Sequence, residues 1–120
     1  MKPQTVIVDT GPIAAFLNKK DHYHEWTKAQ LATMSPPLLT CEAVLSESCF
    51  LLRHYENGAS NVLTLLERKL LTTPFRLEDE LIAVKELLNK YNNIPMSLAD
   101  GCLVRLAEQI TDSVVFTLGI

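Results

Sequence analysis

The stretch that decides the fold is Val6-Ile7-Val8-Asp9-Thr10-Gly11-Pro12-Ile13, near the start of the chain. Its first three residues form a β-branched run, which is typical of a buried strand in a parallel sheet. Asp9-Thr10-Gly11-Pro12 is a turn signal, and the apolar residues after it predict a helix. We therefore expect a strand that passes almost directly into a helix, with an acidic residue at the junction.

The same alternation continues along the chain. We expect strands at 6–8, 38–39, 71–74 and 114–117, the third of them as a strand or a turn, and helices at 13–17, 21–34, 40–55, 59–70, 78–91 and 98–110. Alternating strands and helices predict an α/β fold in which a parallel sheet is covered on both faces. The length fits a single domain over residues 1–120.

The bulk composition narrows the class of function. A net charge of -3 and a pI near 5.5 argue against a broad basic surface that grips nucleic acid, although an acidic site could still cleave it. The cysteines show no CxxC spacing, which favours free thiols in a reducing compartment. No stretch approaches the ~18 apolar residues of a membrane span. We expect a cytoplasmic protein with no membrane association.

Two acids occupy unusual positions. Asp9 ends an apolar strand, where the carboxyl ends of parallel strands form binding sites; the alternative is an Asx-type turn residue. Glu47 shares its predicted helix face with Val44, Phe50 and Leu51, so its carboxylate would lose hydration unless an ion or hydrogen bonds compensate. The alternative for Glu47 is a place at the edge of that apolar face, within reach of solvent.

The third acid is Asp100, whose neighbours one turn on are Leu103 and Val104. Ser97-x-x-Asp100 is also the pattern of a capping box, and the cap and metal-binding roles are compatible. Carboxylates that converge from three distant segments repel one another unless a cation lies among them. Hard oxygen ligands suit Mg²⁺ or Mn²⁺, so we predict such a metal site at the carboxyl edge of the sheet.

Three stretches in order along the chain resemble the PIN-domain family, in particular the VapC-like toxin ribonucleases of bacterial toxin–antitoxin pairs. They are residues 6–13, Val44-Leu45-Ser46-Glu47 and Met96-Ser97-Leu98-Ala99-Asp100, and residues 21–26 are similar to the start of the family's second helix. The resemblance implies a three-layer α/β/α fold with a short central parallel sheet. It also implies a Mg²⁺- or Mn²⁺-dependent endoribonuclease that hydrolyses RNA phosphodiesters, a cognate antitoxin that covers its site, and a homodimer.

The resemblance also implies the roles of individual residues. Asp9 and Asp100 would be direct metal ligands. Glu47 would complete the site, through a bound water, and orient the attacking water. The supporting hydrogen-bonding residues would be Thr10, Ser97 and Thr117.

One position departs from the family pattern. The family has a further acid after its last strand, in a Thr-x-Asp pattern, whereas this chain has Thr117-Leu118-Gly119 and then ends at Ile120. A truncated member with a depleted site would bind metal weakly and cut slowly. The alternative function is a PIN-like binding module that acts through protein partners. A phosphatase of the haloacid dehalogenase type needs an acid where Gly11 stands, and a receiver domain needs an acidic pair and a lysine that are not evident.

Several aromatic side chains exceed what the small core needs, which predicts association with an antitoxin or a second copy. They are His22, Tyr23, Trp26, Phe50 and Tyr55, and the alternative is that they are core residues. His24 is interpreted as a packing or hydrogen-bonding residue rather than a catalytic base.

Overall fold

A parallel four-stranded sheet lies at the centre of the molecule. The computed structural model describes residues 4–118. The strands are β1 (Thr5–Val8), β2 (Leu38–Leu39), β3 (Leu71–Thr72) and β4 (Ser113–Phe116), in the order β3-β2-β1-β4. Both neighbours of β1 run parallel to it. The β-branched run at residues 6–8 thus lies in a central strand, with β2 on one side and β4 on the other.

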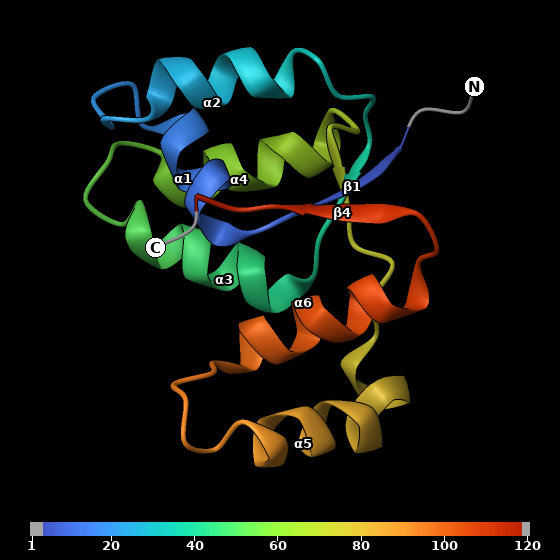
Figure 1. The fold of residues 1–120 in the computed structure, drawn as a ribbon. Coiled ribbons are helices and arrows are strands. Elements are labelled where there is room, and N and C mark those ends of the chain that lie inside the picture. The colour runs from blue at the N-terminus through green and yellow to red at the C-terminus, as the bar shows by residue number, and fades with distance from the viewer. Residues whose placement is uncertain (1–3, 119–120) are drawn as a thin grey trace.

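The helices enclose this sheet in layers. They are α1 (Thr10–Leu17), α2 (His24–Leu31), α3 (Glu42–Leu51), α4 (Gly58–Glu67), α5 (Leu81–Lys90) and α6 (Leu98–Gln109), with a 3-10 turn η1 (Leu77–Glu80) before α5. Figure 1 shows α1, α2 and α4 on one side of the sheet and α6 on the other, with α5 outermost. Helix α3 contacts α1, α4 and α6. The expected three-layer α/β/α architecture is confirmed.

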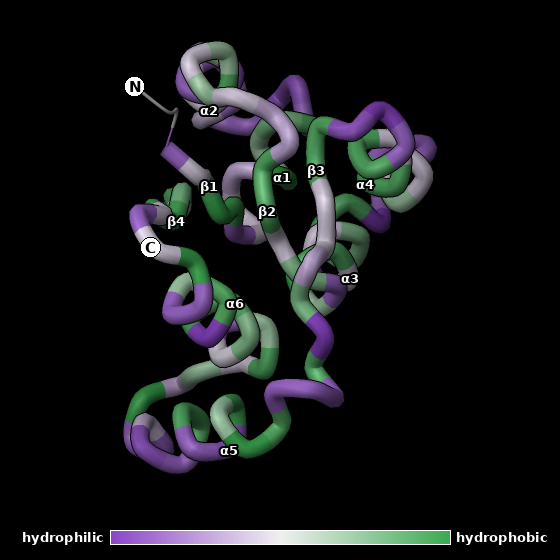
Figure 2. The backbone as a smooth tube through the Cα atoms, turned by 90° about the vertical axis from the view of Figure 1, so that its right-hand side faces the viewer, coloured by the Kyte–Doolittle hydropathy of each residue, from purple (hydrophilic) through white to green (hydrophobic). Residues whose placement is uncertain are grey.

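The core is centred on β1. Ile7 and Val8 are almost completely buried, because strands on both sides and helices on both faces cover them. Figure 2 shows apolar residues along the strands and the inner helices, whereas α5 mixes polar and apolar residues. Burial of these branched side chains stabilises the sheet by roughly 1.5–3 kcal/mol each.

The structure corrects several predicted helix ends. Helix α1 begins at Thr10, three residues early, because the Asp9 side chain caps it. Residues 21–23 form a turn before α2 rather than its first residues. The predicted N-cap Thr40 is also wrong, because its buried hydroxyl donates to the carbonyl of Val8 (2.9 Å) and Cys41 occupies the cap position of α3.

The other predicted elements lie close to their observed positions. Helix α6 begins after Ser97, as expected, and β2 has the predicted bounds. Within the part of the chain that the structure describes, no helix has the length and apolar character needed to cross a membrane.

Candidate active site

The junction of β1 and α1 holds the first acid. The Asp9 backbone N–H donates to the carbonyl of Phe116 (3.0 Å), which continues the β1–β4 ladder to this residue. The Asp9 carboxylate accepts the backbone N–H of Thr10 on Oδ1 (2.7 Å) and the hydroxyl of Thr117 on Oδ2 (3.1 Å). The two alternatives for Asp9 therefore coexist: it makes a local turn contact, and it lies at the carboxyl edge of the sheet.

Glu47 reaches the same edge from α3. Its Oε1 accepts the hydroxyl of Thr10 (3.1 Å), so Thr10 bridges Asp9 and Glu47 with its backbone and its side chain. We call Asp9, Thr10, Glu47 and Thr117 the edge network. It joins side chains from residues 108 positions apart in the sequence.

The apolar face expected around Glu47 is only partly buried. Val44 is fully buried, one turn before Glu47, but Phe50 and Leu51 are more than half exposed. Helix α3 extends beyond the core at its C-terminal end, and Glu47 lies half-buried at that boundary. The interpretation of Glu47 as an acid within a buried face is therefore wrong, and the interpretation of an acid at the edge of that face is correct.

Asp100 lies in the first turn of α6. Its backbone N–H donates to Ser97 Oγ (3.0 Å), and its Oδ2 accepts the backbone N–H of Ser97 (3.0 Å), which completes a capping box. We call Ser97 and Asp100 the cap. The capping role is confirmed, and the carboxylate of Asp100 is half-buried, as those of Asp9 and Glu47 are.

The edge network supplies hard oxygen atoms that suit Mg²⁺. Within residues 4–118, no group of three or more His, Cys, Asp or Glu side chains is gathered closely enough to hold a metal ion. Mg²⁺ commonly needs only one or two carboxylates, because it keeps several waters and takes substrate phosphates as further ligands. Oδ1 of Asp9 accepts the Thr10 N–H and Oδ2 accepts the Thr117 hydroxyl, and each oxygen has a second lone pair. The donor chemistry fits the ion, and the metal roles of the acids stay a prediction.

Two buried thiols lie where α3 packs against α6, the helix that carries the cap. Cys41, at the start of α3, and Cys102, in α6, lie beside each other. Burial raises the pKa of the Cys41 thiol to about 11, with a smaller contribution from the nearby negative charge of Asp9. Burial likewise raises the pKa of Cys102. Both thiols are protonated at neutral pH and act as packing residues, which agrees with the reading of the cysteines as free thiols.

Other polar side chains that could suggest chemistry have structural partners. His24 is buried, and its Nδ1–H donates to the carbonyl of Ala15 (2.9 Å), so its predicted hydrogen-bonding role is confirmed. Arg53 lies over the ring of Phe50 at 3.9 Å. The hydrogen bond to Glu80 (2.7 Å) raises the pKa of Arg105 above its usual value.

The C-terminal positions bear on the depleted-site hypothesis. Gly119 lies outside the described residues, so its replacement of an acid stays a prediction from the sequence. Leu118 passes close to the start of α1, since a Cβ built on Gly11 would lie 3.4 Å from that of Leu118. The segment after β4 therefore runs beside the edge network.

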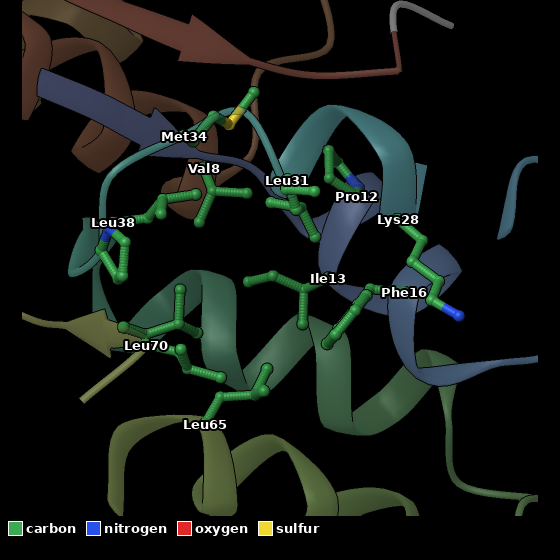
Figure 3. Close-up of a pocket in the computed structure, with 13 residues that line it drawn as sticks. Val8, Pro12, Ile13, Phe16, Lys28, Leu31, Met34, Leu38, Leu65 and Leu70 are labelled. Carbon is green, nitrogen blue, oxygen red and sulfur yellow. The ribbon is translucent and has the colours of Figure 1, made fainter. Parts of the chain in front are cut away.

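A large apolar cavity lies beside the site, within the helix layer. Its volume is about 290 Å³, and it is lined by side chains from β1, α1, α2, β2, α4 and β3. Figure 3 shows Val8, Ile13, Leu31 and Leu65 around it, with the amine of Lys28 pointing away. No lining residue is acidic. The cavity therefore offers no carboxylate ligands for a metal ion.

Comparison with known proteins assigns the class. The model of the PIN domain family matches residues 6–119, which is nearly the whole chain, and the chain belongs to the PIN domain family. The crystal structure of Mycobacterium tuberculosis VapC20, a toxin that cleaves the sarcin–ricin loop, is similar over 96% of this chain and 92% of that chain. The TM-score is 0.78 and the sequence identity is 23%, so the likeness extends through the fold. No protein with a curated description matches the sequence significantly.

Proposed function

We propose that the protein is a metal-dependent endoribonuclease that hydrolyses RNA phosphodiesters, acting in the cytoplasm as the toxin of a toxin–antitoxin pair. One observation carries the proposal: Thr10 bridges Asp9 and Glu47 at the carboxyl edge of a PIN-family sheet. Carboxylates held in one network at that edge suit a divalent cation and a phosphate group. The similar fold of VapC20, a toxin that cleaves RNA, also supports an RNA-cleaving function.

In this proposal the residues of the edge network and the cap have different roles. Asp9 and Asp100 would bind Mg²⁺ or Mn²⁺, and Glu47 would complete the site through a water. The ion would supply charge compensation at the phosphate and a more acidic bound water. Thr10 would hold the Asp9 and Glu47 carboxylates in a fixed relation through its two hydrogen bonds. Thr117 would orient Asp9 from the opposite side, and the cap would hold the start of α6 in place.

Glu47 has a specific role in this proposal. Its Oε1 is occupied by the Thr10 hydroxyl, whereas no hydrogen bond within residues 4–118 engages Oε2. That second oxygen can accept a proton from a water, which orients the water for attack on phosphorus. The half-buried position of the carboxylate excludes part of the bulk solvent and leaves access for substrate.

The test is cleavage of labelled single-stranded RNA by the purified chain. Activity should require Mg²⁺ or Mn²⁺ and disappear with EDTA. Asp9→Asn keeps the shape of the side chain but removes its charge, so cleavage should fall by at least about 100-fold, since even residues that only support metal ligands change activity ~10–100-fold. Glu47→Gln should cause a similar loss. Wild-type cleavage that matches Asp9→Asn, or that persists in EDTA, would refute the proposal.

A second candidate function is a PIN-like module that binds partners without cutting RNA. The observation in its favour is that no three potential ligands are gathered within the described residues. Five aromatic side chains are also exposed, with Trp26 and Phe50 more than half accessible, so they are not core residues. A chain without cleavage or metal binding, recovered with a protein partner, would favour this candidate. Association with an antitoxin and a second copy is proposed under either function.

A further inference from the structure

An aromatic hollow lies directly beside the edge network. Its volume is about 360 Å³, and its lining residues are His22, Tyr23, Trp26, Thr117 and Leu118. The first three belong to the start of α2 and the turn before it, and the last two follow β4. Two segments about 90 positions apart in the sequence therefore form one concave surface.

The hollow is continuous with the acids through Thr117. Thr117 lines the hollow, and its hydroxyl donates to Asp9 Oδ2 at 3.1 Å. A group bound in the hollow would thus lie one side chain away from the carboxylate proposed to act on the phosphodiester. None of the lining residues is acidic, so the hollow itself does not repel a polyanion.

The rings are held in place but remain open to a ligand. Trp26 packs on Phe116 with a centroid distance of 5.9 Å, yet 51% of Trp26 is exposed. The ring of Tyr23 packs edge-to-face with that of His22, at a centroid distance of 4.9 Å, and 47% of Tyr23 is exposed. The backbone N–H of Tyr23 donates to Asp21 Oδ1 (2.8 Å), which fixes the turn. Rings that are supported on one side and accessible on the other are suited to stacking.

We propose that this hollow binds a nucleobase of the RNA substrate, stacked on Trp26 and Tyr23, beside the phosphate that is cut. The inference rests on the proposed function, because it assigns a substrate subsite to that same site. Sequence-specific and single-stranded RNA recognition commonly uses unstacked bases on aromatic side chains. A base in the hollow would position its own phosphate near Asp9, so the subsite would select unpaired RNA over duplex.

Trp26 is the sole tryptophan in the chain, which makes the test direct. The Glu47→Gln protein, which is expected to bind RNA without cutting it, is titrated with an oligouridylate and with an abasic ribose–phosphate strand of the same length. Stacking should quench the tryptophan emission with the oligouridylate and leave it unchanged with the abasic strand. Equal quenching by both strands, or none by either, would overturn the proposal.

Substitutions in the same background measure the size of the effect by fluorescence anisotropy of labelled RNA. Trp26→Ala should raise the Kd roughly 5- to 150-fold, which is the range for one base stacked on an aromatic ring. Trp26→Phe should restore most of the affinity. The matched control is Phe50→Ala, which removes an exposed ring outside the hollow and should leave the Kd unchanged.

Tyr23→Ala guards against misfolding, because it removes a ring without touching the Trp26–Phe116 contact. If both alanine variants keep their helical circular dichroism and bind RNA as tightly as the parent, the subsite is refuted. Loss of self-association without loss of RNA affinity would identify the surface as a protein contact and would refute it too.

The two proposals fail in different ways. Cleavage assays of Trp26→Ala with an intact Glu47 should show a raised KM for single-stranded RNA and a nearly unchanged kcat. Normal cleavage with an unchanged KM refutes the subsite and leaves the nuclease proposal standing. If the wild-type protein shows no metal-dependent cleavage, the nuclease proposal is refuted. Quenching that depends on the bases would in that case show an RNA-binding subsite without catalysis.

Discussion

The edge network and the cap contain acids of similar burial, but they are built in different ways. Ser97 and Asp100 are three positions apart and satisfy each other within one helix turn. Asp9 and Glu47 depend on Thr10, and on elements that come together only when the chain folds. The comparison shows that Asp100 is positioned by local backbone geometry, Glu47 by tertiary packing, and Asp9 by a local contact and a long-range one.

The energetic consequences differ as well. A capping box satisfies free amides at a helix start, so its main contribution is to stability. The edge network satisfies fewer backbone groups and instead links the Asp9 and Glu47 carboxylates through Thr10, an arrangement that suits a cation. Substitutions in the two places should therefore separate activity from stability.

Among substitutions that leave the three acids in place, the largest effect should come from breaking the bridge. Thr10→Val keeps the branched shape and the backbone N–H but removes the hydroxyl that Glu47 accepts. We expect RNA cleavage to fall roughly 10–100-fold. The free energy of unfolding should change by about 1 kcal/mol or less, as for one ordinary hydrogen bond.

Its matched control is Thr64→Val, which removes a hydroxyl that donates to Ser60 on the exposed side of α4. That variant should cleave RNA at the wild-type rate. Urea unfolding and initial cleavage rates on the same preparations decide the outcome. If Thr10→Val and Thr64→Val cleave equally well, the bridge has no catalytic role.

A second prediction concerns the thiol contact between the two regions. Burial raises the pKa of Cys41 from 9.0 to about 11. Between these pH values the unfolded chain releases the thiol proton while the folded chain retains it, so stability is fully present below about pH 9 and falls as pH rises toward about 11. The free energy of unfolding should fall by about 1–2 kcal/mol over this pH range. This is less than the ~1.4 kcal/mol per pKa unit that the whole shift of Cys41 would give.

Urea unfolding at a series of pH values measures this loss. Cys41→Ala should be less stable at neutral pH, because it leaves a small cavity, but its stability should change less across the alkaline range. Cys49→Ala, at a half-buried position in the same helix, serves as the comparison. An alkaline slope that is the same in Cys41→Ala and the parent would contradict the assignment.

The smallest effect should arise at the cap. Ser97→Ala removes the side chain that accepts the Asp100 N–H, and we expect a loss of about 1 kcal/mol of stability. Cleavage should fall by less than in Thr10→Val, because Asp100 can still contact the backbone N–H of residue 97. Ser97→Thr retains a capping hydroxyl and should retain the stability. A larger loss of cleavage in Ser97→Ala than in Thr10→Val would reverse the comparison.

Sequence reasoning worked best where a local rule was sufficient. The β-branched run predicted β1, and Ser97-x-x-Asp100 predicted the capping box that the structure shows. It failed at Thr40, because a cap residue and a residue that donates to a neighbouring strand look the same in sequence. The face around Glu47 left two alternatives open that only the structure separated, because apolar spacing does not reveal where a helix leaves the core.

The adjacency of Thr117 to Tyr23 and Trp26 had no sequence signal at all. These residues lie about 90 positions apart, at the start of α2 and after β4. The aromatic side chains could be recognised as surplus to the core, but their place beside Asp9 required the packing of α2 against the end of β4.

The amino-acid sequence by itself determined the alternation of strands and helices, the first strand, the cap and the family, because each depends on short-range patterns or on ordered motifs. Tertiary structure alone decided that Thr10 bridges Asp9 and Glu47, that Cys41 meets Cys102, and that an aromatic hollow opens beside the acids. The physical reason is that these contacts depend on how far each helix is shifted and turned against the sheet. That displacement is set by the packing of the whole core, which no local stretch encodes.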